Sequence, residues 1–425
     1  MHSTKLWSKN FILDIIINFL LYVIFYQLML WSTKYAIATW QTSISEAGLA
    51  SGIFIIGALS ARIVTGHVID ILGRKKLLLL GTLVYLAALP IYFVCDSLAA
   101  FLIIRCLHGA AYGIAATAAS TIIGAIVPIS RRGEGIGYYA LGNTLASAIG
   151  PFLGITLSSG GDYHLNLYVC LVLSIITLVC AIAIGTPEHE RTPEDMAELK
   201  RVRVESFIYK DALPISFISL LCGICYSTVL SFMGAYTDTL GLLLAGSIFF
   251  IAYAITSMFS RPLIGRFMDH HGGDVVMYPT LIILALCMFT VGISTLNVLF
   301  ALGGILLGLS YSTVTSAGQA LAIHGVHEDH IGLATSTFFI FVDFGVGIGP
   351  YLLGFLVPAY GFTSVYFAGA VIALIGIPLY YILIGRSGVF SYAQMELVRQ
   401  REEAAEAEER AHRREHHRHR HSMSH

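Results

Sequence analysis

The sequence predicts an all-α membrane protein with twelve transmembrane helices in two pseudo-symmetric six-helix bundles. Its composition is strongly apolar, because 56% of the 425 residues are hydrophobic and only 12% are charged, whereas soluble domains average about 25% charged residues. The apolar residues fall into twelve runs, each long enough to cross a hydrocarbon core of about 30 Å. In addition, the second half of the chain repeats features of the first half.

The repeat is defined by four residues that occur twice with the same internal spacing. Each member of the second set lies 199 positions after its counterpart: Arg62, Gly66, Asp70 and Gly73, then Arg261, Gly265, Asp269 and Gly272. The same offset relates Gly150-Pro151 to Gly349-Pro350, and Tyr112 to Tyr311. Repeats that extend through whole halves of a membrane chain are typical of transporters.

The six apolar runs of the first half predict helices at 11–34, 46–69, 77–95, 99–122, 136–158 and 167–186. Those of the second half predict helices at 213–234, 241–260, 275–294, 298–323, 331–356 and 362–384. These runs are long and almost wholly apolar, as between Leu171 and Ile184. A transmembrane β-barrel would show short alternating segments instead, so the spans are expected to be helical.

Composition also predicts the domain boundaries. Residues 1–186 form an N-terminal bundle, 187–212 a charged linker, 213–385 a C-terminal bundle and 386–425 a charged, His-rich tail. Histidines 416, 417, 419 and 421 in the tail could bind a transition metal, because imidazole is a common ligand. A solvated tail without a fixed geometry is the favoured alternative, so no metal site is predicted.

The distribution of Lys and Arg predicts the orientation. The loops on one side, 70–76, 123–135, 187–212 and 266–274, hold eleven of these residues, and the opposite loops hold none apart from Lys34 at a helix end. Positive loops stay in the cytoplasm, so both termini are expected there, in a multi-pass protein of the plasma (inner) membrane. We expect a monomer whose partners are the lipid bilayer and a small-molecule substrate, with no role for nucleic acid.

The loop between the second and third runs reads GHVIDILGRKK, from Gly66 to Lys76. This segment resembles the G-x-x-x-D-x-x-G-R-[RK] signature of the major facilitator superfamily, and with twelve runs and a central linker the resemblance covers nearly the whole chain. It implies the major facilitator fold. It also implies that Asp70 contacts the eleventh helix, that Asp269 contacts the fifth, and that these contacts close the cytoplasmic gate.

The residues assigned to this gate are the repeated ones and the first basic residue of the loop: Arg62, Gly66, Asp70, Gly73, Arg74, Arg261, Gly265 and Asp269. Glycine lets helix ends approach closely and permits tight turns, and a carboxylate suits a helix N-terminus. The alternative is that the basic residues of the loop only fix the topology.

Arg105 lies inside the fourth predicted helix, followed by Gly109 four residues later. A charge at the bilayer centre costs about 2.5–3.5 kcal/mol on insertion scales, so this arginine requires a function or a partner. The R-x-x-x-G pattern resembles a second signature of the superfamily, in which the arginine takes part in proton coupling. The position 199 residues later is Gly304, so the charge is not repeated.

The fifth predicted helix contains LGNTLASAIGPFLG, which resembles the Gly-Pro signature of the drug:proton antiporters, the efflux branch of the superfamily. Glycines at these spacings allow close helix packing, and proline bends a helix. Gly150, Pro151 and Gly154, with Gly349 and Pro350 in the repeat, are therefore hinge candidates.

Asp343 is the most central carboxylate of the sequence, about 18 Å from the start of the eleventh predicted helix at 1.5 Å per residue. At this depth a carboxyl group is suited to load and release a proton or to bind a cationic substrate. The alternative is a salt bridge or polar contact between helices, for which Arg105 is the candidate partner. Asp14 is a second proton-coupling candidate, although its position near the start of the first helix is equally compatible with simple snorkelling.

Amphipathic rings and a few amides are expected to line a substrate cavity between the bundles. These residues are Tyr26, Tyr112, Asn143, Tyr226, Tyr253, Tyr311, Gln319 and Phe338. Taken singly, each is more often a packing residue or part of an interfacial belt.

The sequence therefore predicts a secondary active transporter that exports a small amphipathic compound in exchange for protons. It contains no G-x-x-x-x-G-K-[ST] nucleotide loop and no nucleophile pattern. We accordingly expect no enzyme activity and no cofactor, with a proton gradient as the driving force. The alternatives are a proton-coupled uptake symporter, an exporter of a metal chelate and, more remotely, a receptor that binds ligand without moving it.

Overall fold

The structure is a computed structural model that describes residues 6–42, 44–158, 163–186, 207–242, 244–397, 400–401 and 404. Most of the predicted linker and the His-rich end of the tail lie outside these residues. The described chain is helical apart from a single isolated bridge between Gly272 and Ser391.

All twelve predicted spans are present as helices. The first bundle contains α1 (Lys9–Trp40), α2 (Ile44–Leu72), α3 (Arg74–Ile91), α4 (Leu98–Ile126), α5 (Arg132–Ser158) and α6 (His164–Ala183). The second contains α8 (Leu213–Thr239), α9 (Ala245–His271), α10 (Asp274–Gly292), α11 (Asn297–Ala322), α12 (Ile331–Gly354) and α14 (Phe362–Leu383), with the short α13 (Val357–Tyr360) between the last two. Eleven segments of the described chain are long and apolar enough to cross a membrane. The twelfth helix, α5, has 27 residues and lies among them.

The repeated glycines end corresponding helices. Gly73 separates α2 from α3 with φ 96°, and Gly272 separates α9 from α10 with φ 91°. Only glycine adopts such dihedral angles without steric strain, which explains why the turn residue is kept in both halves. Arg74 follows Gly73 as the first residue of α3 and is buried. Lys75 donates hydrogen bonds to the last carbonyl groups of α6, the end of a helix that favours a cation.

Each bundle has its own apolar core. The core of the first bundle includes Trp31, Tyr85 and Phe101, and the core of the second includes Phe249 and Phe300. Many large apolar side chains remain exposed on the outer faces of the bundles. In water so much exposed apolar surface would promote association, whereas in a bilayer it contacts lipid.

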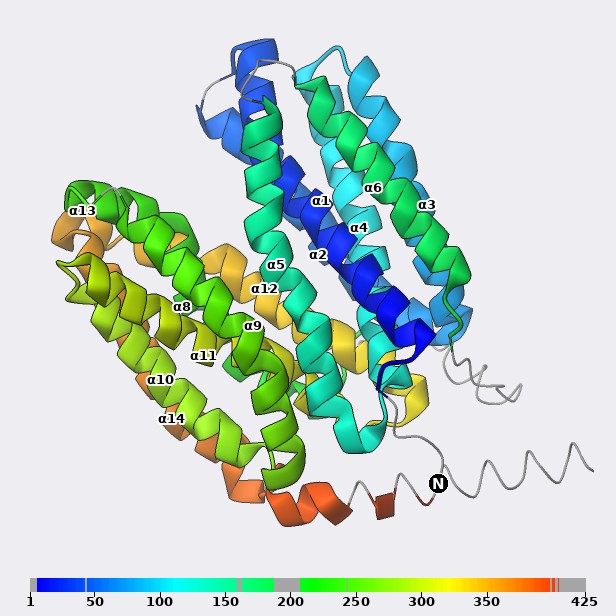
Figure 1. Ribbon diagram of the computed structural model, residues 1–425, viewed down its shortest axis with the longest axis vertical. Coiled ribbons are helices and arrows are strands. Elements are labelled where there is room, and N and C mark those ends of the chain that lie inside the picture. Colours follow the sequence, from blue (N-terminus) through cyan, green and yellow to red (C-terminus); the bar gives the residue numbers. More distant parts are fainter. Residues whose placement is uncertain are drawn as a thin grey trace, which may run out of the picture.

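The two bundles form a V (Figure 1). They meet at the end of the molecule that carries the turns at Gly73, Pro128, Gly272 and Gly325, which we call the basic end. Two pairs of helices make the principal contact between the bundles, α2 with α12 and α5 with α9. The opposite ends of the bundles diverge (Figure 1). Functional contacts between the bundles are therefore to be sought along these two helix pairs.

Candidate functional site

The first contact between the bundles lies at the basic end of α2 and α12. The carboxylate of Asp70 accepts a hydrogen bond from the backbone N–H of Leu333 at 3.2 Å, in the first turn of α12. Ser336 donates from its hydroxyl to the carbonyl of Arg62 at 2.6 Å. A Cβ on Gly66 would lie only 2.5 Å from the hydroxyl oxygen of Ser336, so glycine is required for this approach. The contact that the family resemblance implied for Asp70 is present.

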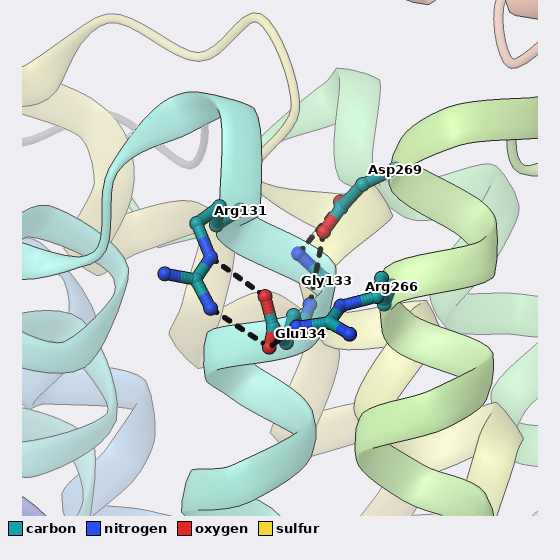
Figure 2. A network of polar contacts seen from close by, with 5 residues as sticks. All are labelled: Arg131, Gly133, Glu134, Arg266 and Asp269. Carbon is teal, nitrogen blue, oxygen red and sulfur yellow. Dashed lines mark hydrogen bonds and ion pairs between the residues drawn. The ribbon is translucent and has the colours of Figure 1, made fainter. Parts of the chain in front are cut away.

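The second contact, between α5 and α9, has the same design. Asp269 accepts hydrogen bonds from the backbone N–H groups of Gly133 at 2.8 Å and Glu134 at 3.0 Å (Figure 2). The first turn of a helix has unpaired N–H groups and a positive dipole end, so a carboxylate is stabilised there. Gly265 faces Gly133 so closely that no side chain fits between the helices. The predicted contact of Asp269 with the fifth helix is therefore confirmed.

An ionic network adjoins this second contact, and the sequence analysis did not foresee it. Glu134 binds the guanidinium of Arg131 at 2.7 and 2.8 Å, and Arg266 reaches the same carboxylate from α9 at 2.9 Å (Figure 2). Arg266 and Glu134 belong to different bundles, so the pair joins them directly. The only sequence signal for it was the position of Arg131 and Arg266 in two of the basic loops.

These contacts confirm the repeat in three dimensions. Leu333 lies 199 positions after Glu134, so the amide that Asp70 binds corresponds to an amide that Asp269 binds. Gln319 donates to the carbonyl of Ser120 at 3.4 Å, and these two residues are themselves 199 positions apart. Counterparts that touch must lie beside the pseudo-twofold axis. Gln319, predicted to line the substrate cavity, instead joins α11 to α4 and is buried.

Asp343 and Arg62 form the deepest ionic contact between the bundles. The Nε atom of Arg62 lies 3.0 Å from Oδ2 of Asp343, in an ion pair that is not aligned as a hydrogen bond. Arg62 is buried and its guanidinium also faces the rings of Tyr112 at 5.9 Å and Phe339 at 5.2 Å. The side chain of Asp343 remains 30% exposed. The carboxylate is therefore accessible although it binds the opposite bundle.

The salt bridge between helices that the sequence analysis kept as an alternative for Asp343 is present, but its partner is Arg62 and not Arg105. Arg105 lies seven residues into α4, about 10 Å from the helix end opposite the basic end. Its Nε donates to the carbonyl of Ala50 at 3.0 Å and its guanidinium lies 4.7 Å from the ring centre of Phe54. Both partners belong to α2, so Arg105 joins helices within the first bundle. Among the described residues Arg105 has no contact with the second bundle, and its role in proton coupling stays a prediction.

Asp14 does not snorkel to the surface, which corrects the second reading of this residue. It is fully buried, and neither carboxylate oxygen has a hydrogen-bond partner among the described residues. The buried hydroxyl of Tyr139, which interacts with Asp14 electrostatically, also lacks a partner. Asp14 lies on α1 in the first bundle, and Tyr139 interacts electrostatically with both Asp14 and Arg62.

The predicted aromatic residues are divided between the two bundles. Tyr226 and Tyr311 stack at 3.9 Å in the second bundle, with Tyr253 6.1 Å from Tyr226. In the first bundle the ring of Tyr112 packs against Tyr22, which in turn contacts Tyr26. Tyr112 and Tyr311, which are repeat counterparts, thus belong to corresponding aromatic groups.

Two other predicted cavity residues have internal roles. Phe338 is fully buried in the core of the second bundle, packed against Gly318. Its neighbour Phe339 is the ring that faces Arg62, because adjacent residues of a helix point about 100° apart. Asn143 accepts a hydrogen bond from Asn18 at 2.6 Å, which joins α5 to α1 within the first bundle.

The predicted hinge positions are sites of close helix packing. A Cβ on Gly150 would lie 2.6 Å from that of Tyr26, and one on Gly154 would lie 2.8 Å from the carbonyl of Gln27, both on α1. Gly349 contacts α8 in the corresponding way, at the carbonyl of Ile224. Helices α5 and α12 continue through Pro151 and Pro350 without interruption. The flexing of these helices stays a prediction.

A titratable residue that the sequence analysis did not single out lies where the bundles meet at the basic end. His324 follows α11 and lines a small pocket with Arg132, Asp269 and Tyr392. Arg132 reaches from the first bundle and donates to the carbonyl of Ile323 at 3.4 Å. Burial and the nearby charge of Arg132 lower the pKa of His324 from 6.5 to about 4. The imidazole is thus neutral while the bundles are in contact.

Comparison with known proteins identifies the family. The model of the Major Facilitator Superfamily matches residues 10–296 and 244–415. An MFS-type transporter of Methanocaldococcus jannaschii is 24% identical over 83% of this chain and 89% of its own length. The staphylopine export protein of Staphylococcus aureus is 23% identical over 75% of this chain and 82% of its own length. The multidrug resistance protein MdtG of Escherichia fergusonii is 24% identical over 87% of this chain and 93% of its own length.

Solved structures agree on the fold. The structure of the human organic anion transporter MFSD10 superimposes with a TM-score of 0.71 at 15% sequence identity. The superposition covers 88% of this chain and 99% of that one. A likeness at this low identity supports the arrangement of the helices.

Proposed function

Because this chain belongs to the major facilitator superfamily, we propose that it exports a small amphipathic compound by alternating access, in exchange for protons. It is a membrane transporter and not an enzyme. The basic end is assigned to the cytoplasm, since positively charged loops stay on that side of a plasma membrane. The names of two relatives, an export protein and a multidrug resistance protein, support outward transport.

The observation that carries the proposal is the ion pair between Arg62 and Asp343. It joins the two bundles halfway along α12, and the side chain of Asp343 stays 30% exposed. A proton on Asp343 removes its negative charge and with it the electrostatic attraction to Arg62. Protonation at this position therefore changes the strength of a contact that holds the bundles together.

The carboxylates at the basic end act as the inner gate in this proposal. Asp70 and Asp269 hold the first turns of α12 and α5, so both contacts must break before the basic end opens. The corresponding geometry of the two contacts supports a symmetric rocking motion of the bundles. Glu134 and Arg266 add an ionic contact at the same end.

Transport of a fluorescent amphipathic dye by protein reconstituted into liposomes, with an imposed pH gradient, tests the proposal. We expect the wild type to move dye against its concentration gradient only while the pH gradient lasts. Asp343→Asn should abolish the dependence on the gradient and leave exchange of dye down its own gradient. Asp274→Asn is the matched control, because Asp274 is bound by Tyr380 within the second bundle. Full gradient-driven accumulation by Asp343→Asn would remove the proton role of Asp343.

A further inference from the structure

The second repeated arginine, Arg261, is a buried cation without a counter-ion. It lies on α9, is only 4% exposed, and its Nε has no hydrogen-bond partner. Among the residues that the structure describes, no carboxylate lies within ion-pair distance of it. An uncompensated charge at membrane depth is unfavourable, so its retention calls for a ligand.

The repeat shows what is missing beside Arg261. Its counterpart Arg62 binds Asp343, and the residue 199 positions before Asp343 is Thr144 on α5. The surrounding backbone is equivalent in the two halves. The carbonyl of Arg62 contacts Ser336, and the carbonyl of Arg261 contacts Gly137, the counterpart of Ser336. The second half of the repeat therefore keeps the arginine and replaces the carboxylate with a hydroxyl.

Thr144 is itself buried without a partner. It is 3% exposed and its hydroxyl makes no hydrogen bond with any residue that the structure describes. Thr121 satisfies its hydroxyl with the carbonyl of Thr117 one turn back, whereas the hydroxyls of Thr144, Thr117 and Thr335 have no partner among the described residues. The second bundle thus contributes the unpaired Nε–H of Arg261, and the first bundle contributes the unpaired hydroxyl of Thr144. These two residues are the repeat counterparts of the ion pair Arg62–Asp343. Both groups can donate a hydrogen bond to the same anion.

The gate does not use the guanidinium of Arg261. In α9 the contacts that close the basic end come from Gly265, Arg266 and Asp269, one to two turns further along the helix. The contact of Arg261 with α5 is made by its carbonyl, at Gly137. The gating role predicted for Arg261 from the sequence thus has no side-chain contact behind it.

Aromatic rings adjoin this position. The hydroxyl of Tyr26, on α1, is close enough to Arg261, Tyr253 and Asp343 to interact with all three electrostatically. Tyr253 lies on the same helix as Arg261, eight residues earlier, and belongs to the aromatic group with Tyr226. A ligand that carries an anion at Arg261 would place an apolar body against these rings.

We propose that Arg261 and Thr144 bind the anionic group of the transported compound, a carboxylate, sulfonate or phosphate. The assignment rests on the proposed transport function and narrows its substrate to amphipathic molecules with an anionic head. The anion occupies the place that Asp343 takes in the other half of the repeat. Of the two repeated arginines, Arg62 is then neutralised by Asp343 and Arg261 by the substrate.

Calorimetric titration of the full-length protein in lipid nanodiscs tests this site. The probes are 2-naphthoate, 2-naphthalenemethanol and 2-naphthylmethylamine, which share a ring and differ in charge. We expect 2-naphthoate to bind at least about tenfold more tightly than the alcohol, because charge-assisted hydrogen bonds are roughly twice as strong as neutral ones. Arg261→Gln should remove this preference and Arg261→Lys should keep part of it.

Thr144→Asp supplies the carboxylate that the repeat lacks. It should pair with Arg261, remove the preference for 2-naphthoate and raise the melting temperature of the ligand-free protein, a result that misfolding does not produce. Arg386→Gln is the control, since it removes an exposed positive charge at the end of α14. Absence of any preference for 2-naphthoate in the wild type, or a preference that survives both Arg261→Gln and Thr144→Asp, overturns the anion site.

The two proposals fail separately. If the wild type shows no preference for 2-naphthoate but its dye transport still depends on the pH gradient, the anion site is rejected and the proposed transport function is kept. A normal anion preference in a protein whose transport ignores the pH gradient would do the reverse.

Discussion

The interface of α2 with α12 and the interface of α5 with α9 are two versions of one structure. Each has an aspartate on the amides of a facing helix, a glycine where the helices approach, and an arginine two turns deeper. They differ at that arginine and at the ion pairs around it. Arg62 binds Asp343, whereas Arg261 has no counter-ion among the described residues and the α5–α9 interface places its ion pair at Glu134.

This difference separates the shared task of the two interfaces from their individual tasks. Features kept in both halves close the basic end, which both bundles must do together. Features that occur in one half only, such as the carboxylate of Asp343, serve functions that need a single site. We assign proton coupling to the half with Asp343 and substrate recognition to the half with Arg261.

The largest effect is expected from breaking the pair that only one interface has. Arg62→Asp places two carboxylates together and should reduce transport by about a hundredfold or more, since breaking a buried ion pair costs about 3–5 kcal/mol. The double variant Arg62→Asp/Asp343→Arg restores opposite charges and should recover part of the activity. Initial rates in liposomes at equal protein density measure both. A double variant no better than Arg62→Asp would contradict the pairing.

The next effect concerns the feature that the interfaces share. Asp70→Ala and Asp269→Ala each remove the acceptor of helix N-terminal amides, so each should favour opening of the basic end and lower the transport rate about tenfold. Cysteine accessibility at the basic end, probed with a membrane-impermeant maleimide, should rise in both variants. Asp96→Ala, in the loop before α4 at the opposite end, is the control. If cysteine accessibility stays unchanged in both variants, the basic end closes without the two carboxylates and the gate assignment is wrong.

A smaller effect is expected from Glu134→Gln, which removes the ionic network of the α5–α9 interface alone. Because Arg266 is 58% exposed, solvent and salt screen this pair, and transport should fall only about twofold to threefold. The wild-type rate should approach that of the variant at high ionic strength. A salt response that is identical in both proteins would argue against the network.

The smallest effect is expected from pH at the basic end. Burial and the charge of Arg132, which belongs to the opposite bundle, lower the pKa of His324 from 6.5 to about 4, so this closed state favours the neutral imidazole. The neutral His324 stabilises the closed state fully above about pH 6.5. This stabilisation is lost as the pH falls towards 4, because His324 binds a proton more readily in the opened state. Maleimide accessibility should therefore rise in acid, and His324→Gln should flatten this response. Arg132, Asp269 and Glu396 line the same pocket, so an acid response that His324→Gln leaves intact would assign the titration to them.

The sequence was sufficient for the helices and for the repeat. Long apolar runs leave few alternatives in a membrane, where every backbone polar group must be satisfied internally, and all twelve helices were predicted. The contacts of Asp70 and Asp269 were also predicted, through the family resemblance. They depend on short-range geometry around a helix N-terminus, which a motif specifies.

Side-chain partners across the bundles could not be predicted in the same way. Arg105 and Arg62 are both arginines inside apolar helices, and only the packing of the bundles places Arg62 beside Asp343. Phe338 and Phe339 are adjacent, yet one is a core residue and the other faces Arg62. The rotation of a helix about its axis decides which side chains face the other bundle. When lipid covers the opposite face, both faces are apolar, so the periodicity of apolar residues does not reveal this rotation.

The central claim is that the proton on Asp343 controls the contact between the bundles. Its most direct test is the distance between spin labels on Val94 and Val298, exposed residues of the two bundles at the end opposite the basic end, measured at several pH values. We predict a distance distribution that shifts with pH in the wild type, and one in Asp343→Asn that matches the low-pH distribution at every pH. The same pH-dependent shift in both proteins would contradict the account.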